Sequence, residues 1–168
     1  MNPHLLIVDD DPFFRDSLKD VLMDEGYSVS EAGDGKVALD MLTQNGNYDL
    51  LLLDLELPRI KGMQVMKTVA DSLPELPVII ISGTGTIPLA VEATKIGAYD
   101  FVEKDDDPRK TLVKVRNAIE KSQLLRQRNR LVAEQREHYK MVGSGAAMQE
   151  IFHLIDRAAH NTTKVLIT

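Results

Sequence analysis

The sequence predicts an α/β fold in which a five-stranded parallel sheet carries helices on both faces and is extended by a long linker helix. Short apolar runs alternate with stretches of helical spacing from residue 4 to residue 107. One run, Leu50–Leu53, is unbroken leucine, which is typical of a strand covered on both faces. Strands that alternate with helices predict a parallel sheet, because each helix then connects two parallel strands.

The period of the apolar residues distinguishes the helices from the strands. In the first predicted helix, one face carries Phe14, Leu18, Val21 and Leu22, as a helix packed on a core requires. The strands are short runs rich in leucine and β-branched residues. They are expected at Leu5–Val8, Ser28–Ala32, Leu50–Leu53, Val78–Ile81 and Asp100–Glu103.

Aspartate residues mark where several helices begin. Asp11-Pro12 and Asp107-Pro108 each place an N-cap carboxylate before a proline at the first helical position. Asp34, which follows a glycine, predicts a further cap. Asp11 is therefore interpreted as a helix cap and is left out of the acidic residues that could bind a metal.

A long helix is predicted from Pro108 to Lys140, because no glycine or further proline interrupts the sequence there. At 1.5 Å per residue it would be about 50 Å long. Its later part fits either a short dimeric coiled coil, in one of two heptad registers, or a plain surface helix. One register places Ala118, Ser122, Leu125, Asn129 and Val132 in the seam, and the other uses Leu124 and Leu131.

The charge is distributed unevenly along the chain. The net charge is −6, but residues 1–108 carry −13 and residues 109–140 carry +7, which predicts an acidic domain and a basic helical connector. The connector resembles no nucleic-acid recognition element, which argues against DNA contact there.

There is no cysteine, which excludes disulfides and thiolate metal sites, and no apolar run approaches the roughly 20 residues of a membrane helix. A soluble cytoplasmic protein without membrane contact is expected.

Polar side chains follow the ends of four predicted strands. Asp9 and Asp10 follow the first strand and Asp54 the third, while Ser82 follows the fourth and Lys104 the fifth. Because the carboxyl ends of parallel strands meet at one edge, these side chains are expected to lie together. Clustered carboxylates repel unless a cation lies among them, and their hard oxygens suit Mg²⁺. One carboxylate can then attack phosphorus, so the sequence predicts a site that forms an aspartyl phosphate.

Four sequence motifs occur in an informative order over residues 4–122. They are Leu6-Ile7-Val8-Asp9-Asp10-Asp11, Leu53-Asp54-Leu55-Glu56-Leu57-Pro58-Arg59-Ile60-Lys61-Gly62, Ile79-Ile80-Ile81-Ser82-Gly83 and Gly97-Ala98-Tyr99-Asp100-Phe101-Val102-Glu103-Lys104. Together they resemble the receiver domain of two-component response regulators, which has a flavodoxin-like or CheY-like fold. Each motif alone is weak, and the four in this order are specific.

The resemblance implies a role for each acidic residue at a matching position. Asp54 is implied to be the phosphoacceptor, and a sensor histidine kinase is implied to be its phosphoryl donor. Asp9, Asp10 and Asp54 are implied ligands of Mg²⁺, together with the backbone carbonyl of Glu56.

The resemblance also implies a switch. Ser82 and Lys104 would bind the phosphoryl group, and Phe101 would pack inward as Ser82 moves toward it. The family usually has a proline after the lysine, often with a cis bond, whereas Asp105 stands here. A cis bond before a residue other than proline costs about 2.5–4 kcal/mol, so this loop is expected to differ. The carboxylates at 105–107 are also expected to compete for the lysine.

The last residues resemble a second family. After Gly143-Ser144-Gly145 come an amphipathic stretch and a strand-like run, Lys164–Thr168. Residues 141–168 thus resemble the start of the AAA+ ATPase domain of NtrC-type, sigma-54-dependent transcriptional activators. The Walker A pattern G-x-x-x-x-G-K-[ST] does not occur, so no ATPase activity is expected of these 168 residues, which are interpreted either as a truncated piece of a longer regulator or as a natural remnant of one. The predicted domains are a receiver at 1–122, a helical linker at 123–140 and an AAA+ fragment at 141–168.

These features predict a phosphorylated receiver whose dimerisation controls a sigma-54-activator ATPase, rather than an enzyme. The homodimer is expected to use the fourth helix, fifth strand, fifth helix and linker, whereas sigma-54 RNA polymerase and DNA would contact only regions missing here. One alternative is a receiver-like interaction module that needs no phosphorylation. Another is a Mg²⁺-dependent phosphatase with an aspartate nucleophile, although Glu56 stands where its second catalytic aspartate would be. A flavodoxin-like flavin carrier is disfavoured, because the first loop, where the flavin phosphate would bind, is acidic and would repel it.

Overall fold

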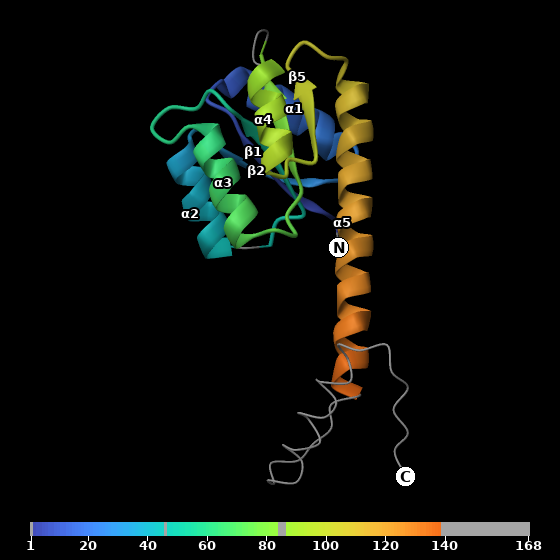
Figure 1. The fold of residues 1–168 in the computed structure, drawn as a ribbon. Helices are drawn as coiled ribbons and strands as arrows, with labels where there is room; N and C mark the ends of the chain where they lie inside the picture. Colours follow the sequence, from blue (N-terminus) through green and yellow to red (C-terminus); the bar gives the residue numbers. More distant parts are fainter. Residues whose placement is uncertain (1, 46, 84–86, 139–168) are drawn as a thin grey trace, which may run out of the picture. The chain divides into compact units, whose positions relative to one another are not determined.

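The structure of the chain, a computed structural model, describes residues 2–45, 47–83 and 87–138 (Figure 1). The chain divides into two compact units, Met1–Asn129 and Arg130–Thr168. The first unit contains the whole sheet, and within the second the structure describes only the helical residues up to His138. The predicted AAA+ fragment at 141–168 lies outside the described residues and stays a prediction.

Strands and helices alternate strictly, and each predicted strand is found within one residue of its expected bounds. The strands are β1 (His4–Val8), β2 (Ser28–Ala32), β3 (Leu50–Asp54), β4 (Val78–Ser82) and β5 (Asp100–Glu103). The helices are α1 (Pro12–Asp24), α2 (Gly35–Asn45), α3 (Gly62–Ser72), α4 (Ile87–Ile96) and α5 (Pro108–His138).

The five strands form one parallel sheet in the order β2-β1-β3-β4-β5, which confirms the predicted fold class. The strand order reverses between β1 and β3, where Val8 pairs with Leu53. In sheets of this kind a ligand binds beyond the carboxyl ends of the strands at such a reversal. The two strands that end in Asp9 and Asp54 are therefore neighbours at the place where a site is expected.

The leucine run of β3 is buried because both faces of the sheet are covered (Figure 1). Leu51 and Leu53 belong to a core with buried residues of α2, α3 and α4, while Leu50 and Leu52 belong to a core with buried residues of α1 and α5. This alternation is the two-residue period of a strand. Burial on both faces explains why the run contains no polar residue before Asp54.

The predicted helix caps are present. The side chain of Asp11 accepts hydrogen bonds from Phe13 N and Phe14 N at the start of α1, and Pro12 follows it as the first helical residue. Asp107 accepts from Arg109 N at 2.9 Å at the start of α5. These contacts satisfy backbone N–H groups that a helix start otherwise leaves without a partner.

Helix α5 begins at the predicted proline and is described to His138, two residues short of the predicted end. The first of the two coiled-coil registers conflicts with its packing, because Ala118 is fully buried and Ser122 is 7% exposed within the first unit. Leu124, which belongs to the second register, is 66% exposed. A helix of a second chain can therefore contact Leu124 in the second register without displacing Ala118 and Ser122 from their packing on the receiver.

Candidate functional site

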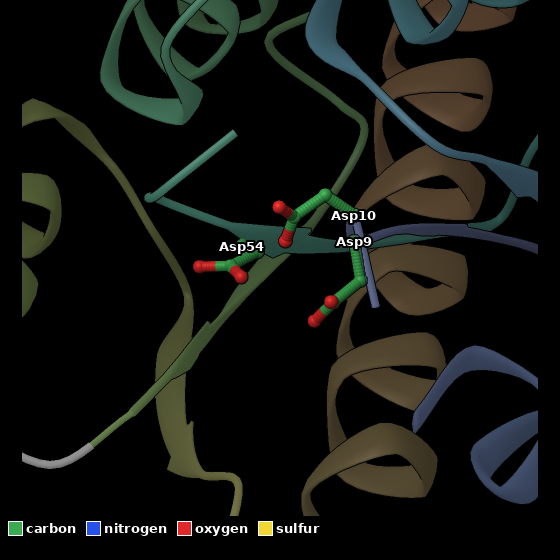
Figure 2. A group of neighbouring side chains, drawn as sticks. All are labelled: Asp9, Asp10 and Asp54. Atoms are coloured by element: carbon green, nitrogen blue, oxygen red, sulfur yellow. The ribbon is translucent and has the colours of Figure 1, made fainter. Parts of the chain in front are cut away.

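Three carboxylates gather where β1 and β3 end. Asp9 and Asp10 follow β1, and Asp54 is the last residue of β3; Figure 2 shows their side chains close together. One carboxylate oxygen from each lies within 4.8 Å of one from each of the others. Asp9 and Asp54 are buried and Asp10 is exposed, so one side of the cluster opens to solvent. The predicted acidic cluster is thus formed by the pairing of β1 with β3.

Lys104 joins the cluster from the end of β5. Its Nζ lies 2.7 Å from Asp9 Oδ2 and donates a hydrogen bond of 2.7 Å to Asp54 Oδ2. Burial lowers the pKa of Lys104, but its contacts with Asp54 and Asp9 outweigh burial and hold that pKa above its ordinary value. The ammonium group is therefore charged at neutral pH, beside the carboxylate implied to be the phosphoacceptor.

Asp9 carries the clearest sign that the cluster lacks positive charge. Its side chain is fully buried, and its Oδ2 pairs at 2.7 Å with the Lys104 ammonium, which Asp9 has to share with Asp54. Burial raises the pKa of Asp9 above its ordinary value, and the nearby Lys104 opposes this only in part. Two buried carboxylates that share one ammonium group, with a third carboxylate nearby, suit a hard divalent cation such as Mg²⁺.

The other residues implied by the resemblance surround the cluster. Ser82 ends β4 and is buried, and its hydroxyl donates to the carbonyl of Gly83 at 3.1 Å. Glu56 has an exposed side chain, while its backbone N–H donates to Asp54 Oδ1 at 2.9 Å. Phe101 on β5 is half-buried, and Lys114 Nζ of α5 lies 5.0 Å from its ring centroid. These placements are compatible with the implied roles, which stay predictions.

Two supporting residues on α1 were missed by sequence reasoning. Arg15 donates a hydrogen bond of 2.7 Å to the backbone carbonyl of Asp9, and this contact holds the loop that carries the acidic pair. Phe14 places its ring 5.1 Å from Lys104 Nζ, a cation–π contact that helps to orient the ammonium. Phe14 was expected only to pack on the core, and no spacing in the sequence marks Arg15.

The loop after β3 is braced by a second missed contact. Arg59 has a φ of 63°, a left-handed conformation that costs about 1–2 kcal/mol for a residue other than glycine. Its guanidinium pairs with Asp34 Oδ2, while Asp34 Oδ1 caps α2 by accepting from Lys36 N and Val37 N. Asp34 is buried, and each of its two carboxylate oxygens has a partner: the start of α2 for one and Arg59 for the other.

Replacing Asp34 should separate its two contacts. Asp34→Ala removes the helix cap and the partner of Arg59, and we expect a loss of about 1–2 kcal/mol in the free energy of unfolding. Asp34→Ser keeps a capping oxygen and should lose less. Urea unfolding measures both values, and equal losses in the two variants would contradict the capping role.

The loop after Lys104 differs from the expectation in one respect. The carboxylates at 105–107 were expected to compete for Lys104, but among the described contacts Asp106 pairs with Lys110 and Asp107 caps α5. Lys104 instead contacts Asp9 and Asp54, and its backbone N–H donates to the Ser82 carbonyl at 2.8 Å. The competition was predicted wrongly because local partners on α5 engage two of the three carboxylates. Within the described ranges no peptide bond is cis.

Comparison with known proteins identifies the family. The family model described as "Response regulator receiver domain" matches residues 5–116. The nitrogen assimilation regulatory protein NtrX of Azorhizobium caulinodans is 34% identical over 164 residues, covering 97% of this chain and 36% of the relative. The C4-dicarboxylate transport transcriptional regulatory protein DctD of Pseudomonas aeruginosa is 33% identical over 167 residues, with the same two coverages.

A solved structure agrees in fold and sequence. The receiver domain of NtrX from Brucella abortus superposes with a TM-score of 0.66 at 36% identity, covering 69% of this chain and 98% of that structure. The chain spans about a third of the length of the curated relatives it matches. No helix in the described part of the chain is long and apolar enough to cross a membrane.

The family predicted from the four motifs is therefore confirmed. The relatives NtrX and DctD also support the predicted resemblance to regulators of the NtrC type. The shared sequence includes the strands and loops that bring Asp9, Asp54 and Lys104 together. The chain belongs to the response-regulator receiver family.

Proposed function

We propose that the chain receives a phosphoryl group on Asp54 from a sensor histidine kinase. The observation that supports this most directly is one carboxylate at a strand end, held by a half-buried lysine and flanked by two further carboxylates. A carboxylate oxygen of Asp54 attacks phosphorus as the bond from phosphorus to the histidine nitrogen breaks. The freed electron pair and a proton then restore the neutral imidazole of the kinase.

Each neighbouring group has a defined task in this transfer. Asp9, Asp10, Asp54 and the backbone carbonyl of Glu56 would hold Mg²⁺, which supplies positive charge that offsets the negative charge of the transferring phosphoryl oxygens. The Lys104 ammonium keeps its charge and moves from pairing with Asp54 to pairing with a phosphoryl oxygen. The Ser82 hydroxyl exchanges its bond to Gly83 for a second phosphoryl oxygen.

The proposed output is a change of dimerisation. Phosphorylation adds about −1.5 to −2 charges at the edge of the sheet. Movement of Ser82 toward that charge leaves space into which Phe101 can turn, and Phe101 lies beside Lys114 of α5. We propose that this changes homodimerisation through α4, β5, α5 and the linker helix, and so controls a sigma-54-activator ATPase in the cytoplasm. Polymerase and DNA would be contacted by other parts of such a regulator.

Intact mass spectrometry tests this proposal. After incubation with acetyl phosphate and Mg²⁺ we expect a single acid-labile phosphoryl adduct, and none when EDTA removes the metal. Light scattering with and without beryllofluoride then gives the direction of the change in dimerisation. If no adduct forms with acetyl phosphate or with a phosphorylated kinase, the phosphorylation-independent interaction module becomes the better interpretation; Asp105 at the usual proline position is the feature that favours it.

Magnesium should stabilise the folded chain, and Asp9 should determine by how much. At a concentration 100 times its Kd, a ligand that binds only the folded state adds about 2.7 kcal/mol. Because the pKa of Asp9 is raised, the stability gained from its protonation is full below pH 3.8 and is lost as pH rises through the raised pKa. At pH 7 the ionised carboxyl therefore destabilises the fold until a cation binds.

The variant Asp9→Asn should test both the destabilisation by the ionised carboxyl of Asp9 and the part of the Mg²⁺ stabilisation that depends on it. In EDTA at pH 7 we expect it to melt at a higher temperature than the wild type, and to gain less from added Mg²⁺. Thermal unfolding with Na⁺ at matched ionic strength is the control for general screening. An equal gain from Mg²⁺ in the variant and the wild type would place the metal elsewhere.

A further inference from the structure

The second half of α5 is attached to the receiver at the end of the sheet opposite the acidic cluster. Asp49 directly precedes β3 and Glu75 precedes β4, so both lie at the amino ends of strands. Three α5 residues face them: Ser122, Arg126 and Asn129. Their spacings of four and three residues place them on one face of the helix. These five residues are called the basal latch below.

The basal latch consists of three ordinary polar contacts. The Ser122 hydroxyl donates to the Glu75 carbonyl at 3.1 Å, and Asn129 Nδ2 donates to Glu75 Oε1 at 3.0 Å. Arg126 Nη1 contacts Asp49 Oδ1 at 3.2 Å. Asp49 is itself held in place, because its other oxygen accepts from the backbone N–H of His4 at 2.9 Å. Two separate loops of the receiver therefore hold the same helix face.

Apolar packing does not explain why residues 122–129 of α5 stay against the receiver. Ile119 is the last buried apolar residue of α5 in the described chain, and Leu125 is already 41% exposed. A hollow of about 390 Å³ lies beside the latch, lined by residues that include Pro74, Tyr99 and Leu125. Because no apolar residue of α5 after Ile119 is buried in the described chain, the polar contacts of the basal latch are what hold residues 122–129 against the receiver.

The latch uses the residues that the first coiled-coil register would place between two chains. Ser122 and Asn129 belong to that seam, and in the structure both bind Glu75 of their own chain. Ser122 is buried there, so a second helix cannot contact it while the latch is closed. Pairing through this seam therefore requires the latch to open.

We propose that the basal latch is a conformational lock in which the receiver's own base and a second copy of the chain compete for one face of α5. With the latch closed, residues 122–129 are held on the receiver and that seam is blocked. With the latch open, the same face can pair with its equivalent in a second chain. The proposal goes beyond the proposed phosphoryl transfer and does not depend on it, because every contact in it lies away from Asp54.

The test compares the wild-type 168-residue chain with Glu75→Ala, Arg126→Ala and the double variant, all without a phosphoryl donor. The matched control is Gln127→Ala, because Gln127 is exposed on the same helix and makes no hydrogen bond or ion pair within the described residues. It also shares with Arg126→Ala the change to alanine, the residue with the highest helix propensity. Hydrogen–deuterium exchange of peptides covering residues 120–130 reports whether the helix is held.

In the double variant we expect amide exchange over residues 120–130 to become about fivefold faster, since a partly buried ion pair and an exposed hydrogen bond are lost. Exchange in β3 and β4 should not change, which shows that the fold is intact. Light scattering over a concentration series should show a tighter dimer in the double variant than in Gln127→Ala. Unchanged exchange at 120–130 would overturn the latch, and an unchanged, weaker or absent dimer would overturn the competition.

Discussion

Replacing Asp54 by asparagine should abolish the phosphoryl adduct completely. The amide is nearly the same size as the carboxylate, and its single oxygen can still accept the hydrogen bond of the Glu56 backbone N–H, so the fold should persist without the bond from Lys104. It lacks the anionic oxygen that attacks phosphorus. Intact mass after incubation with acetyl phosphate and Mg²⁺ measures the loss, and circular dichroism checks the fold.

Two matched variants separate the phosphoacceptor from the proposed metal ligands. Asp10→Asn keeps Asp54 but removes one exposed carboxylate of the cluster, so the adduct should form only at a raised Mg²⁺ concentration. Glu56→Gln changes a side chain that is exposed and keeps the backbone carbonyl, so it should behave as the wild type. An adduct that persists in Asp54→Asn, or one that is lost in Glu56→Gln, would show that these roles are assigned wrongly.

Replacing Gly62 by alanine should be the most destabilising single change near the site. A Cβ built on Gly62 would lie 1.9 Å from the backbone oxygen of Asp54 and 2.6 Å from Leu55 Cα. Both neighbours are backbone atoms, which cannot rotate away as a side chain can. We expect a loss of about 3 kcal/mol or more, at or beyond the upper end of the usual cost of overpacking.

Urea unfolding measures this loss, and Gly33→Ala is its control. A Cβ on Gly33 would meet only Arg15 Nη1 at 3.7 Å, an ordinary contact. Because the displaced backbone carries Asp54, Gly62→Ala should also weaken the stabilisation by Mg²⁺, whereas Gly33→Ala should not. Similar unfolding free energies for the two variants would contradict the close approach of α3 to the end of β3.

The sequence predicted the fold because local signals and global packing agree. The apolar runs have strand length and lie between helical periods, and burial on both faces of the sheet requires that pattern. The same logic located the site. Once Asp9, Asp54 and Lys104 stand at the carboxyl ends of parallel strands, the topology alone brings them to one edge.

Contacts between loops were not predictable in the same way. Asp34 was expected to cap a helix, and it does, but nothing in its neighbourhood indicates that its second oxygen binds Arg59. Likewise, the acidic run at 105–107 suggested competition for Lys104, whereas nearby groups on α5 engage Asp106 and Asp107. Such choices depend on which side chains meet across loops, and no periodic pattern records them.

Helix α5 shows which features the sequence determines by itself and which only the tertiary structure decides. Its start, its length and its two candidate faces follow from the sequence alone, because proline, the absence of glycine and the spacing of apolar residues are local properties. Which face the receiver occupies was decided only by the tertiary structure. Ser122 and Asn129 suit a seam between two chains as well as they suit Glu75, and the spacing is the same in both cases. Polar groups of this kind bind whichever partner the fold brings within hydrogen-bonding distance, so their partner is a property of the assembled structure.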